Sequence, residues 1–191
     1  MLKDNKKMRN VLLFFWEIAK IVVVAVLIVA PIRYFIFQPF FVQGQSMEPN
    51  FFQGDYLIID QISYRFNDPQ RGEVIVFGYP ENPSQKYIKR IVGLPGETLK
   101  IQEGKVYIID REGSFHVLEE SEYLSESIIT LGDLQRDLGE EQYFVLGDNR
   151  SFSADSRRWG LLKEEYIIGR VFLRLWPFTN ISKIDTPQYS L

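Results

Sequence analysis

The longest feature in the pattern of hydrophobic and polar positions is an apolar run near the start of the chain. Residues 11–32 are apolar except at Glu17 and Lys20. A helix over this run would span about 33 Å, which matches the hydrocarbon thickness of a bilayer. Its two charged residues are three positions apart, so they can pair. Four cations precede the run: Lys3, Lys6, Lys7 and Arg9. We therefore predict one transmembrane helix over 11–32, with residues 1–10 as a basic cytoplasmic tail.

A cleaved signal peptide would also contain an apolar run. The uninterrupted part here, "IVVVAVLIVAPI", is short enough for the apolar region of such a peptide. Three features favour a retained anchor instead. Pro31 follows Ala30, where cleavage would be expected; the apolar character continues through "RYFIFQPFF"; and charged residues lie inside the run. We therefore expect an anchor that is kept, with residues 33–191 extracytoplasmic.

After the anchor the pattern changes to short segments rich in β-branched and aromatic residues, separated by Gly, Pro, Asn and Asp. These segments are 56–60, 73–79, 86–94, 97–101, 105–110, 142–148 and 166–176. Only a weak helical signal, over Leu131–Leu138, competes with them. The pattern predicts a mostly β domain of antiparallel strands with frequent turns.

Charge is distributed unevenly along this domain. Residues 103–141 contain eleven acidic and three basic side chains, whereas the remainder of the chain is net positive. We interpret 103–141 as an acidic insertion between core strands, a solvated surface excursion. The whole chain has a formal net charge of −3, which gives no reason to expect nucleic acid as a partner. A mildly cationic remainder suits anionic lipid.

Composition narrows the chemistry that the chain can perform. There is no cysteine, which excludes disulfides, thiolate catalysis and cysteine-bound zinc. His116 is the sole histidine and lies in the acidic segment, so neither a Ser-His-Asp triad nor a hydrolytic zinc site is expected. A serine in this chain can still be activated by a lysine whose amine is kept neutral.

Lys89 is the best candidate for that lysine. It lies in "YIKRIVGLPGE", and strand alternation puts it on one face with Tyr87 and Ile91 while Arg90 points the other way. An amine on a packed, dry face loses hydration, which disfavours the ammonium form. The pKa of Lys89 is therefore expected to be lowered; a fall from about 10.4 to about 8 needs roughly 3 kcal/mol of desolvation, a modest demand for a buried site. Taken alone, the same pattern also fits a lysine that extends from an ordinary strand to solvent.

A second unusual segment is "GDNRSFSADSRRWG", residues 147–160, which we call the charged loop. It concentrates aspartates, arginines and serines between two glycines. Because carboxylate–guanidinium pairs are directional, such a loop can be held rigid by its own side chains and can position a lysine or a hydroxyl. The alternative is a charged surface turn.

Together these stretches resemble the type I signal peptidases, membrane-bound Ser-Lys proteases, and in particular those of Gram-positive type. The agreement runs along the whole chain: an anchor, then "SMEP", "GDYLIID", "YIKRIVGLPGE" and "GDNRSFSADSR" in that order. The fold that the resemblance implies is an antiparallel β catalytic core with a small inserted subdomain, preceded by one N-terminal transmembrane helix.

The resemblance also implies a role for each matching residue. Ser46 would be the nucleophile and its backbone N–H an oxyanion donor, Lys89 the general base, and Ser153 the residue that orients the lysine. Six residues would support the site: Met47, Pro49, Asp148, Arg150, Asp155 and Arg157. Two positions depart from the family pattern. Gly44 stands where some members have a serine that donates a second oxyanion hydrogen bond, and Asn50 stands where threonine is common.

The function implied is a membrane-anchored serine endopeptidase that cleaves signal peptides from secreted preproteins, close to the secretion machinery. It would need no cofactor and no metal. Its substrates would carry small residues, typically alanine, one and three positions before the cut.

Two other interpretations share parts of the pattern. A self-cleaving Ser-Lys repressor would need a DNA-binding helix-turn-helix, for which residues 11–32 are too apolar. A non-enzymatic, membrane-anchored β module would make the motifs a coincidence.

Aromatic residues gather on both sides of Ser46: Tyr34, Phe35, Phe37, Phe40, Phe41, Phe51 and Phe52. They fit either an interfacial belt in the lipid headgroups or ordinary core packing.

Overall fold

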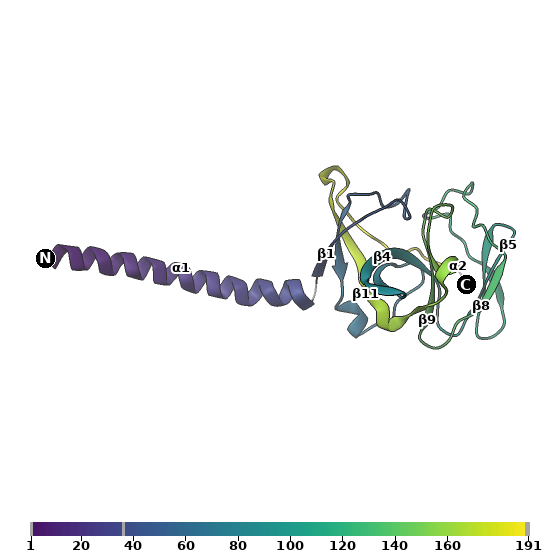
Figure 1. Ribbon diagram of the computed structural model, residues 1–191, viewed down its shortest axis with the longest axis horizontal. Helices are drawn as coiled ribbons and strands as arrows, with labels where there is room; N and C mark the ends of the chain where they lie inside the picture. Colours follow the sequence, from purple (N-terminus) through teal and green to yellow (C-terminus); the bar gives the residue numbers. More distant parts are fainter. Residues whose placement is uncertain (1, 36, 190–191) are drawn as a thin grey trace. The chain divides into compact units, whose positions relative to one another are not determined.

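The computed structural model describes residues 2–35 and 37–189, and the side chains of 12–30 and 38–189 (Figure 1). The chain divides into two compact units, Met1–Gln38 and Pro39–Leu191.

The first unit is dominated by the helix α1 (Leu2–Phe35). Its segment Leu12–Ala30 has a mean hydropathy of 2.6, long and apolar enough to cross a membrane. The predicted N-terminal apolar helix is confirmed, although the helix extends beyond 11–32 at both ends. Lys20 Nζ lies 2.7 Å from a Glu17 carboxylate oxygen, so the expected pair on one helix face is confirmed.

The second unit is built on an eight-stranded sheet. In spatial order its strands are β1 (Phe37–Phe41), β2 (Tyr56–Asp60), β11 (Ile167–Trp176), β3 (Val74–Tyr79), β4 (Asn82–Gly93), β9 (Gln142–Leu146) and β10 (Leu162–Lys163). The short strand β12 (Ser182–Lys183) pairs with β11. The pairs from β2 to β10 are antiparallel.

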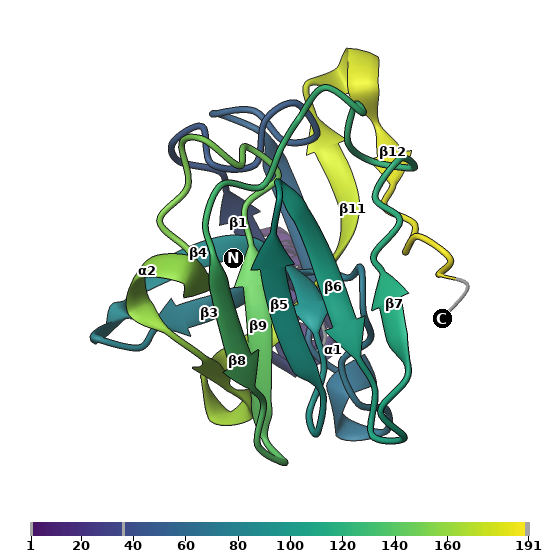
Figure 2. The ribbon, with the colours of Figure 1, turned by 90° about the vertical axis from the view of Figure 1, so that its right-hand side faces the viewer.

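A second sheet of four strands lies beside β9 in the ribbon of Figure 2. Its order is β7 (Phe115–Val117), β6 (Lys105–Ile109), β5 (Thr98–Gln102) and β8 (Leu134–Asp137), all antiparallel. The predicted fold class, antiparallel and mostly β, is confirmed. This sheet begins at Thr98, before the expected insertion at 103–141, and the status of that range as an insertion stays a prediction.

The helical signal over Leu131–Leu138 was wrong, because this segment contains the strand β8. Its residues pair with β5, from Ile101 opposite Leu134 to Thr98 opposite Asp137. A partner strand satisfies the backbone of a segment whose own helical preference is weak, so tertiary pairing decides its structure. Short helical turns complete the unit: η1 (Ser63–Arg65), α2 (Ser156–Trp159), η2 (Glu164–Tyr166) and η3 (Phe178–Asn180).

The hydrophobic core joins the strands to the loop that carries Ser46. Met47 and Phe51, from that loop, are 1% and 2% exposed and pack with Leu57, Val76 and Ile88 of the large sheet. Burying a side chain of this size contributes about 1.5–3 kcal/mol to folding. The part of the loop that directly follows Ser46 is therefore fixed by core packing.

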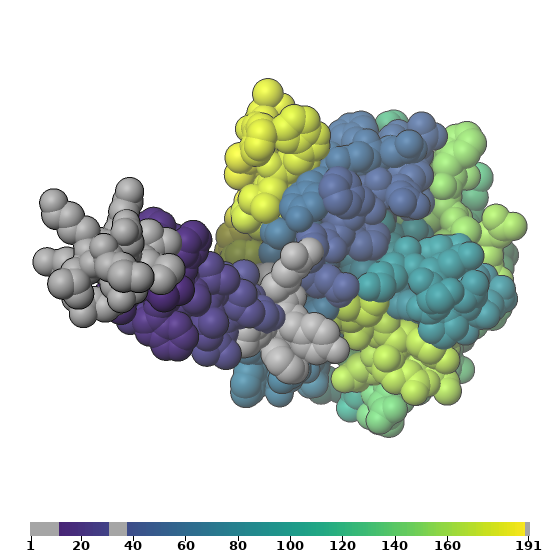
Figure 3. Space-filling view, turned by 60° about the vertical axis from the view of Figure 1, so that its left-hand side comes forward, coloured from purple at the N-terminus to yellow at the C-terminus, as the bar shows by residue number. Residues whose placement is uncertain are grey.

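The aromatic residues near Ser46 divide between core and surface. Phe51 is buried with the Arg174 guanidinium 5.0 Å from its ring centre, whereas Phe41 and Phe52 are exposed. Tyr34, Phe35 and Phe37 lie outside the residues whose side chains are described. Trp176, at the end of β11, and Phe178, shortly after it, are also exposed, with ring centres 4.7 Å apart. The segment that follows β11 is drawn in yellow in Figure 3. A belt over all seven aromatic residues is excluded by Phe51, whose place is in the core.

Candidate active site

The Ser46 loop, residues 42–55, is closed at its base by backbone hydrogen bonds. The Val42 N–H donates to Asp55 O and the Gly54 N–H donates to Val42 O, each with a nitrogen–oxygen distance of 3.0 Å. Above this base the buried Met47 anchors the loop, and Ser46 is half-buried beside it. The Ser46 N–H donates to no other residue in the described part of the chain. It is therefore free to meet an oxygen of a bound molecule.

Lys89 extends from β4 toward this serine. It sits opposite Ile75 in the pairing of β4 with β3 and is 4% exposed. Its Nζ lies 2.7 Å from Ser46 Oγ and 2.7 Å from Ile88 O. The amine is also 5.5 Å from the centre of the Tyr87 ring. The structure thus brings together the two residues that the sequence selects as nucleophile and base.

The surroundings of Lys89 make its amine easier to deprotonate. Burial lowers the pKa of Lys89 to about 8, and it outweighs the opposing attraction of Asp155 and Asp148. Removing water from an ammonium group destabilises the charged form, which is the physical cause expected from the strand pattern. A substantial fraction of the amine is consequently neutral near neutral pH.

The charged loop rests directly on the Ser46 loop. The Asn149 N–H donates to Ser46 O and the Asn149 side-chain amide donates to Gln45 O, each with a nitrogen–oxygen distance of 3.0 Å. Gly147 approaches the same carbonyl so closely that a Cβ there would overlap Ser46 O and Ser153 Oγ, closer than 3.0 Å. These two contacts restrict the position of Ser46. Neither Asn149 nor Gly147 was among the site residues predicted from the sequence. The signal for Gly147 was its place before the aspartate of "GDNR".

Two of the charged side chains of this loop pair outside it and two pair with each other. The fully buried Asp148 accepts two hydrogen bonds from Arg90, over 2.9 and 2.7 Å. Arg150 pairs with Glu120 of the acidic segment. Only Asp155 and Arg157 form a pair within the loop, over 2.8 and 2.9 Å. The expectation that the loop is held by its own side chains is thus only partly met.

Asp155 organises the end of the charged loop. It caps α2 by accepting from the Arg157 N–H over 3.3 Å, and it accepts from the Gly147 N–H over 3.1 Å. Burial alone would raise the pKa of Asp155, but hydrogen bonds and charge attraction from Arg157 and the Gly147 N–H outweigh burial and lower it. The ionised carboxylate therefore ties Gly147, next to the nucleophile, to the short helix.

Within the described residues, no hydrogen bond joins Ser153 to Lys89. Its Oγ is buried and has no hydrogen-bond partner among the described residues. The oxygen lies close to Gly147, against which the loop is packed. An orienting role for Ser153 stays a prediction.

The two positions that depart from the family pattern have clear surroundings. Gly44 has a φ of +83°, and a Cβ there would meet no atom within 4 Å. A serine would therefore fit sterically but would be strained in its backbone. The Asn50 side-chain amide donates to Asp148 Oδ2 and to Tyr123 O, each over 2.8 Å. Asn50 thereby connects the Ser46 loop to the charged loop.

An open groove of about 790 Å³ leads to the Ser46–Lys89 pair. It is lined by Phe40–Phe41, Gln43–Ser46, residues 84–89 of β4, Phe152 and Ala154. β4 pairs with β9 only from Arg90 onward, so in the described part of the chain no strand covers residues 84–88 on that side. Such a groove accommodates a polypeptide in extended conformation.

Other reactive side chains lie elsewhere. His116 is in β7, where it pairs with Asp110 over 3.4 Å. Within the described residues, no cluster of three or more histidine, cysteine or carboxylate side chains is arranged to hold a metal ion.

Comparison with known proteins places this geometry in a family. Residues 15–176 match the model of the family described as signal peptidase, peptidase S26. Signal peptidase I of Bacillus licheniformis is 32% identical over 179 residues, covering 91% of this chain and 94% of that protein. Signal peptidase I of Leptolyngbya laminosa is 35% identical over 175 residues, covering 88% of this chain and 83% of that protein.

A solved structure is also similar. It is a signal peptidase I from Enterococcus faecalis, 32% identical, covering 55% of this chain and 97% of that one with a TM-score of 0.45. The family match extends over most of the chain, from within the apolar helix to the end of β11. It includes both the Ser46 loop and the charged loop. This chain belongs to the signal peptidase family, peptidase S26.

Proposed function

We propose that Ser46 and Lys89 form the catalytic dyad with which this serine endopeptidase cleaves signal peptides from preproteins. The observation that carries the proposal is the 2.7 Å contact between Lys89 Nζ and Ser46 Oγ at a buried amine. A lysine can act as a general base only if it is neutral, and burial of Lys89 favours that form.

The proposed reaction begins with neutral Lys89 and a peptide carbonyl next to Ser46. A neutral amine keeps one hydrogen on Ile88 O, and its lone pair accepts the Ser46 proton as Oγ attacks the carbonyl carbon. The Ser46 N–H stabilises the resulting oxyanion. Lys89 then gives the proton to the leaving amine, which leaves an acyl-enzyme ester. Finally, the lysine activates a water molecule that hydrolyses the ester.

The groove supports a substrate bound as an extended strand. Residues 84–88 of β4 leave one edge of their backbone to solvent, in the groove that Ser46 also lines. Backbone hydrogen bonds to an added strand give affinity with little dependence on sequence, which suits an enzyme with many substrates. Selection would then depend on the few side chains that face the groove beside Ser46, where small residues of the preprotein would fit.

The place of the enzyme follows from the apolar helix. We place Leu12–Ala30 across the cell membrane as a single span, with the basic N-terminus in the cytoplasm and the catalytic unit outside. Phe41, which lines the groove, and Phe52 of the Ser46 loop are both exposed, which supports contact with the lipid headgroups. Signal peptides reach this position from the secretion machinery.

Cleavage of a purified preprotein tests the proposal. We expect the full chain in detergent or liposomes to release the mature protein, and Ser46→Ala to release none above background. Ser114→Ala, an exposed serine in the turn before β7, is the matched control and should cleave normally. Cleavage by Ser46→Ala at the rate of the intact enzyme would show that another nucleophile is used.

The pH dependence of kcat/KM reports the base. With a Lys89 pKa of about 8, the neutral fraction grows as pH rises, so the rate should increase about tenfold per pH unit below 7 and level off above 8. Measuring initial rates from pH 6 to 10, with circular dichroism to verify folding, checks this expectation. A rate that does not change across this range is incompatible with a lysine base of lowered pKa.

A further inference from the structure

The acidic segment reaches the charged loop through one tight turn, residues 120–124. The N–H groups of Tyr123 and Leu124 donate to Glu120 O over 3.1 and 2.9 Å, and Leu124 is buried. The turn lies between β7 and β8 of the second sheet. It is therefore an ordered part of the fold, whereas the sequence pattern indicated a solvated excursion.

The Glu120 carboxylate binds the Arg150 guanidinium with both oxygens. Arg150 Nη1 donates to Oε2 over 2.8 Å, and Nη2 donates to Oε1. Arg150 is 2% exposed, and its Nη1 also donates to Thr130 Oγ1. The Tyr123 hydroxyl adds a 2.5 Å hydrogen bond to Glu120 Oε1. Paired, desolvated charges of this kind restrict motion far more than exposed pairs do.

The same turn contacts the partners of Asp148. The Tyr123 ring lies 4.0 Å from the Arg90 guanidinium, and Tyr123 O accepts a hydrogen bond from the Asn50 amide. Arg90 and Asn50 are two residues that bind the Asp148 carboxylate. The turn thus touches the charged loop on both sides of Asn149, at Arg150 directly and at Asp148 through its partners.

Asn149 and Gly147 transmit this restraint to the nucleophile. The Asn149 N–H binds Ser46 O over 3.0 Å, and Arg150 Nε binds Gly147 O over 3.1 Å. Because Lys89 is fixed in a sheet, the position of the charged loop decides how close Ser46 Oγ comes to the amine. We propose that Glu120 is a positioning residue of the reaction: through Arg150 it holds the charged loop against Ser46. This inference rests on the proposed Ser46–Lys89 dyad.

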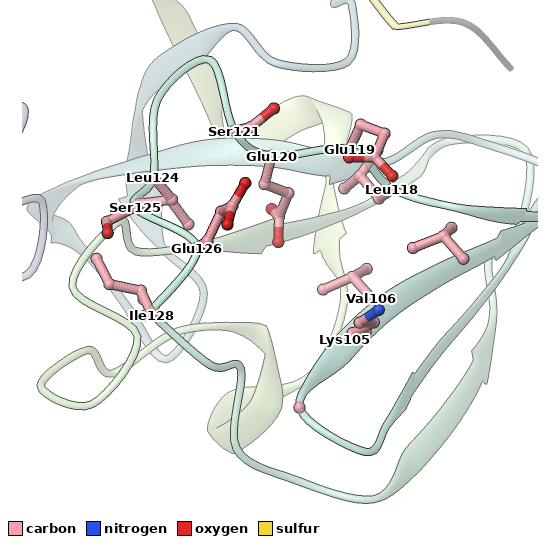
Figure 4. A pocket seen from close by; sticks show the side chains of 12 residues that line it. Lys105, Val106, Leu118, Glu119, Glu120, Ser121, Leu124, Ser125, Glu126 and Ile128 are labelled. Carbon is pink, nitrogen blue, oxygen red and sulfur yellow. The ribbon is translucent and has the colours of Figure 1, made fainter.

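The chain supplies a matched control for Glu120. Glu120 and Glu126 line the same pocket of about 370 Å³, which Figure 4 shows between residues 118–128 and the start of β6. Glu126 is exposed, and in the described residues Arg150 is paired with Glu120 rather than with Glu126. Glu120→Gln and Glu126→Gln each remove one negative charge from this pocket. Glu120→Gln also removes the charge that pairs with Arg150, and Glu126→Gln does not.

The test measures kcat and KM of preprotein cleavage at pH 8, for each variant at a temperature 20 °C below its own thermal midpoint. For Glu120→Gln we expect kcat to fall on the order of tenfold with KM within about twofold, because the groove is untouched while the nucleophile is displaced. Glu126→Gln should retain both values. In the double variant Glu120→Gln/Arg150→Lys, the fold decrease in kcat should be much smaller than the product of the decreases in the two single variants.

Two results would overturn the inference: an unchanged kcat in folded Glu120→Gln, or additive losses in the double variant. Either would show that the pair stabilises the fold only. Where Glu120→Gln does not fold, Thr130→Val removes a neutral acceptor of Arg150 instead, and kcat should fall about threefold at constant KM. A kcat equal to that of the intact enzyme in that variant would also overturn it. A wrong assignment of the Ser46–Lys89 dyad would be detected by a different result, namely cleavage by Ser46→Ala.

Discussion

Replacing Lys89 with methionine is expected to lower preprotein cleavage on the order of 10⁴-fold, the upper end of what a positioned general base typically contributes. Methionine keeps nearly the length of the side chain but has no proton acceptor of useful basicity. The Ser46 hydroxyl would then have no group within hydrogen-bond distance that could take its proton. Turnover of a purified preprotein at pH 8 gives the measurement.

Stability provides the control for this variant. The pKa of Lys89 is lowered to about 8 in the fold, compared with 10.5 for an ordinary lysine. The unfolded chain therefore binds more protons between these values, so wild-type stability rises with pH from about 8 to 10.5. Below pH 8 the buried amine costs about 3 kcal/mol, a burden that methionine removes.

We therefore expect Lys89→Met to be inactive and at least as stable as the wild type at pH 7. Lys163→Met, on the exposed side of β10, should cleave normally. Equilibrium denaturation at pH 7 measures the stability of Lys89→Met, and preprotein cleavage measures the activity of both variants. Cleavage within tenfold of wild type in Lys89→Met would remove the lysine from the mechanism.

Replacing Gly147 with alanine is expected to lower kcat on the order of a hundredfold. The new methyl group would overlap Ser46 O and Ser153 Oγ, at distances under 3.0 Å. Gly147 has no positive φ, so the alanine backbone is unstrained and the effect is purely steric. Either the Ser46 loop or the charged loop must move, and a displacement of about 1 Å at reacting atoms can cost a hundredfold in rate.

Gly139→Ala is the matched control for that substitution. Its methyl group would meet the flexible end of Gln142 at 3.0 Å, far along the chain from the dyad. Steady-state kinetics of both variants, with thermal unfolding to verify the fold, separates steric disturbance of the site from loss of a glycine in general. Wild-type kcat in Gly147→Ala would show that the contact with Ser46 O has no role in catalysis.

Much of the fold could be predicted because strand signals depend on neighbouring residues. The segment 56–60 coincides with β2, and 105–110 and 166–176 agree with β6 and β11 to within one residue. The helical signal over Leu131–Leu138 was wrong because the structure of this segment depends on a distant part of the chain. Its strand is stabilised by pairing with β5, more than thirty residues earlier, which no local pattern contains.

The sequence by itself determined the chemistry that is available to this protein. With no cysteine and one histidine far along the chain from Ser46, a lysine is the base that remains to activate a serine. A lysine between apolar strand residues already indicates a lowered pKa, because strand alternation puts it on a packed face.

Only the tertiary structure decided which charges hold the site together. Spacing within "GDNRSFSADSRRWG" favoured pairs inside that segment, yet Asp148 binds Arg90 and Arg150 binds Glu120. An ion pair depends on the distance between two side chains in space and on their shared burial, and sequence separation limits neither. Folding brings the acidic segment against the charged loop, and it brings Ser46 Oγ to 2.7 Å from the Lys89 amine across 43 positions of sequence.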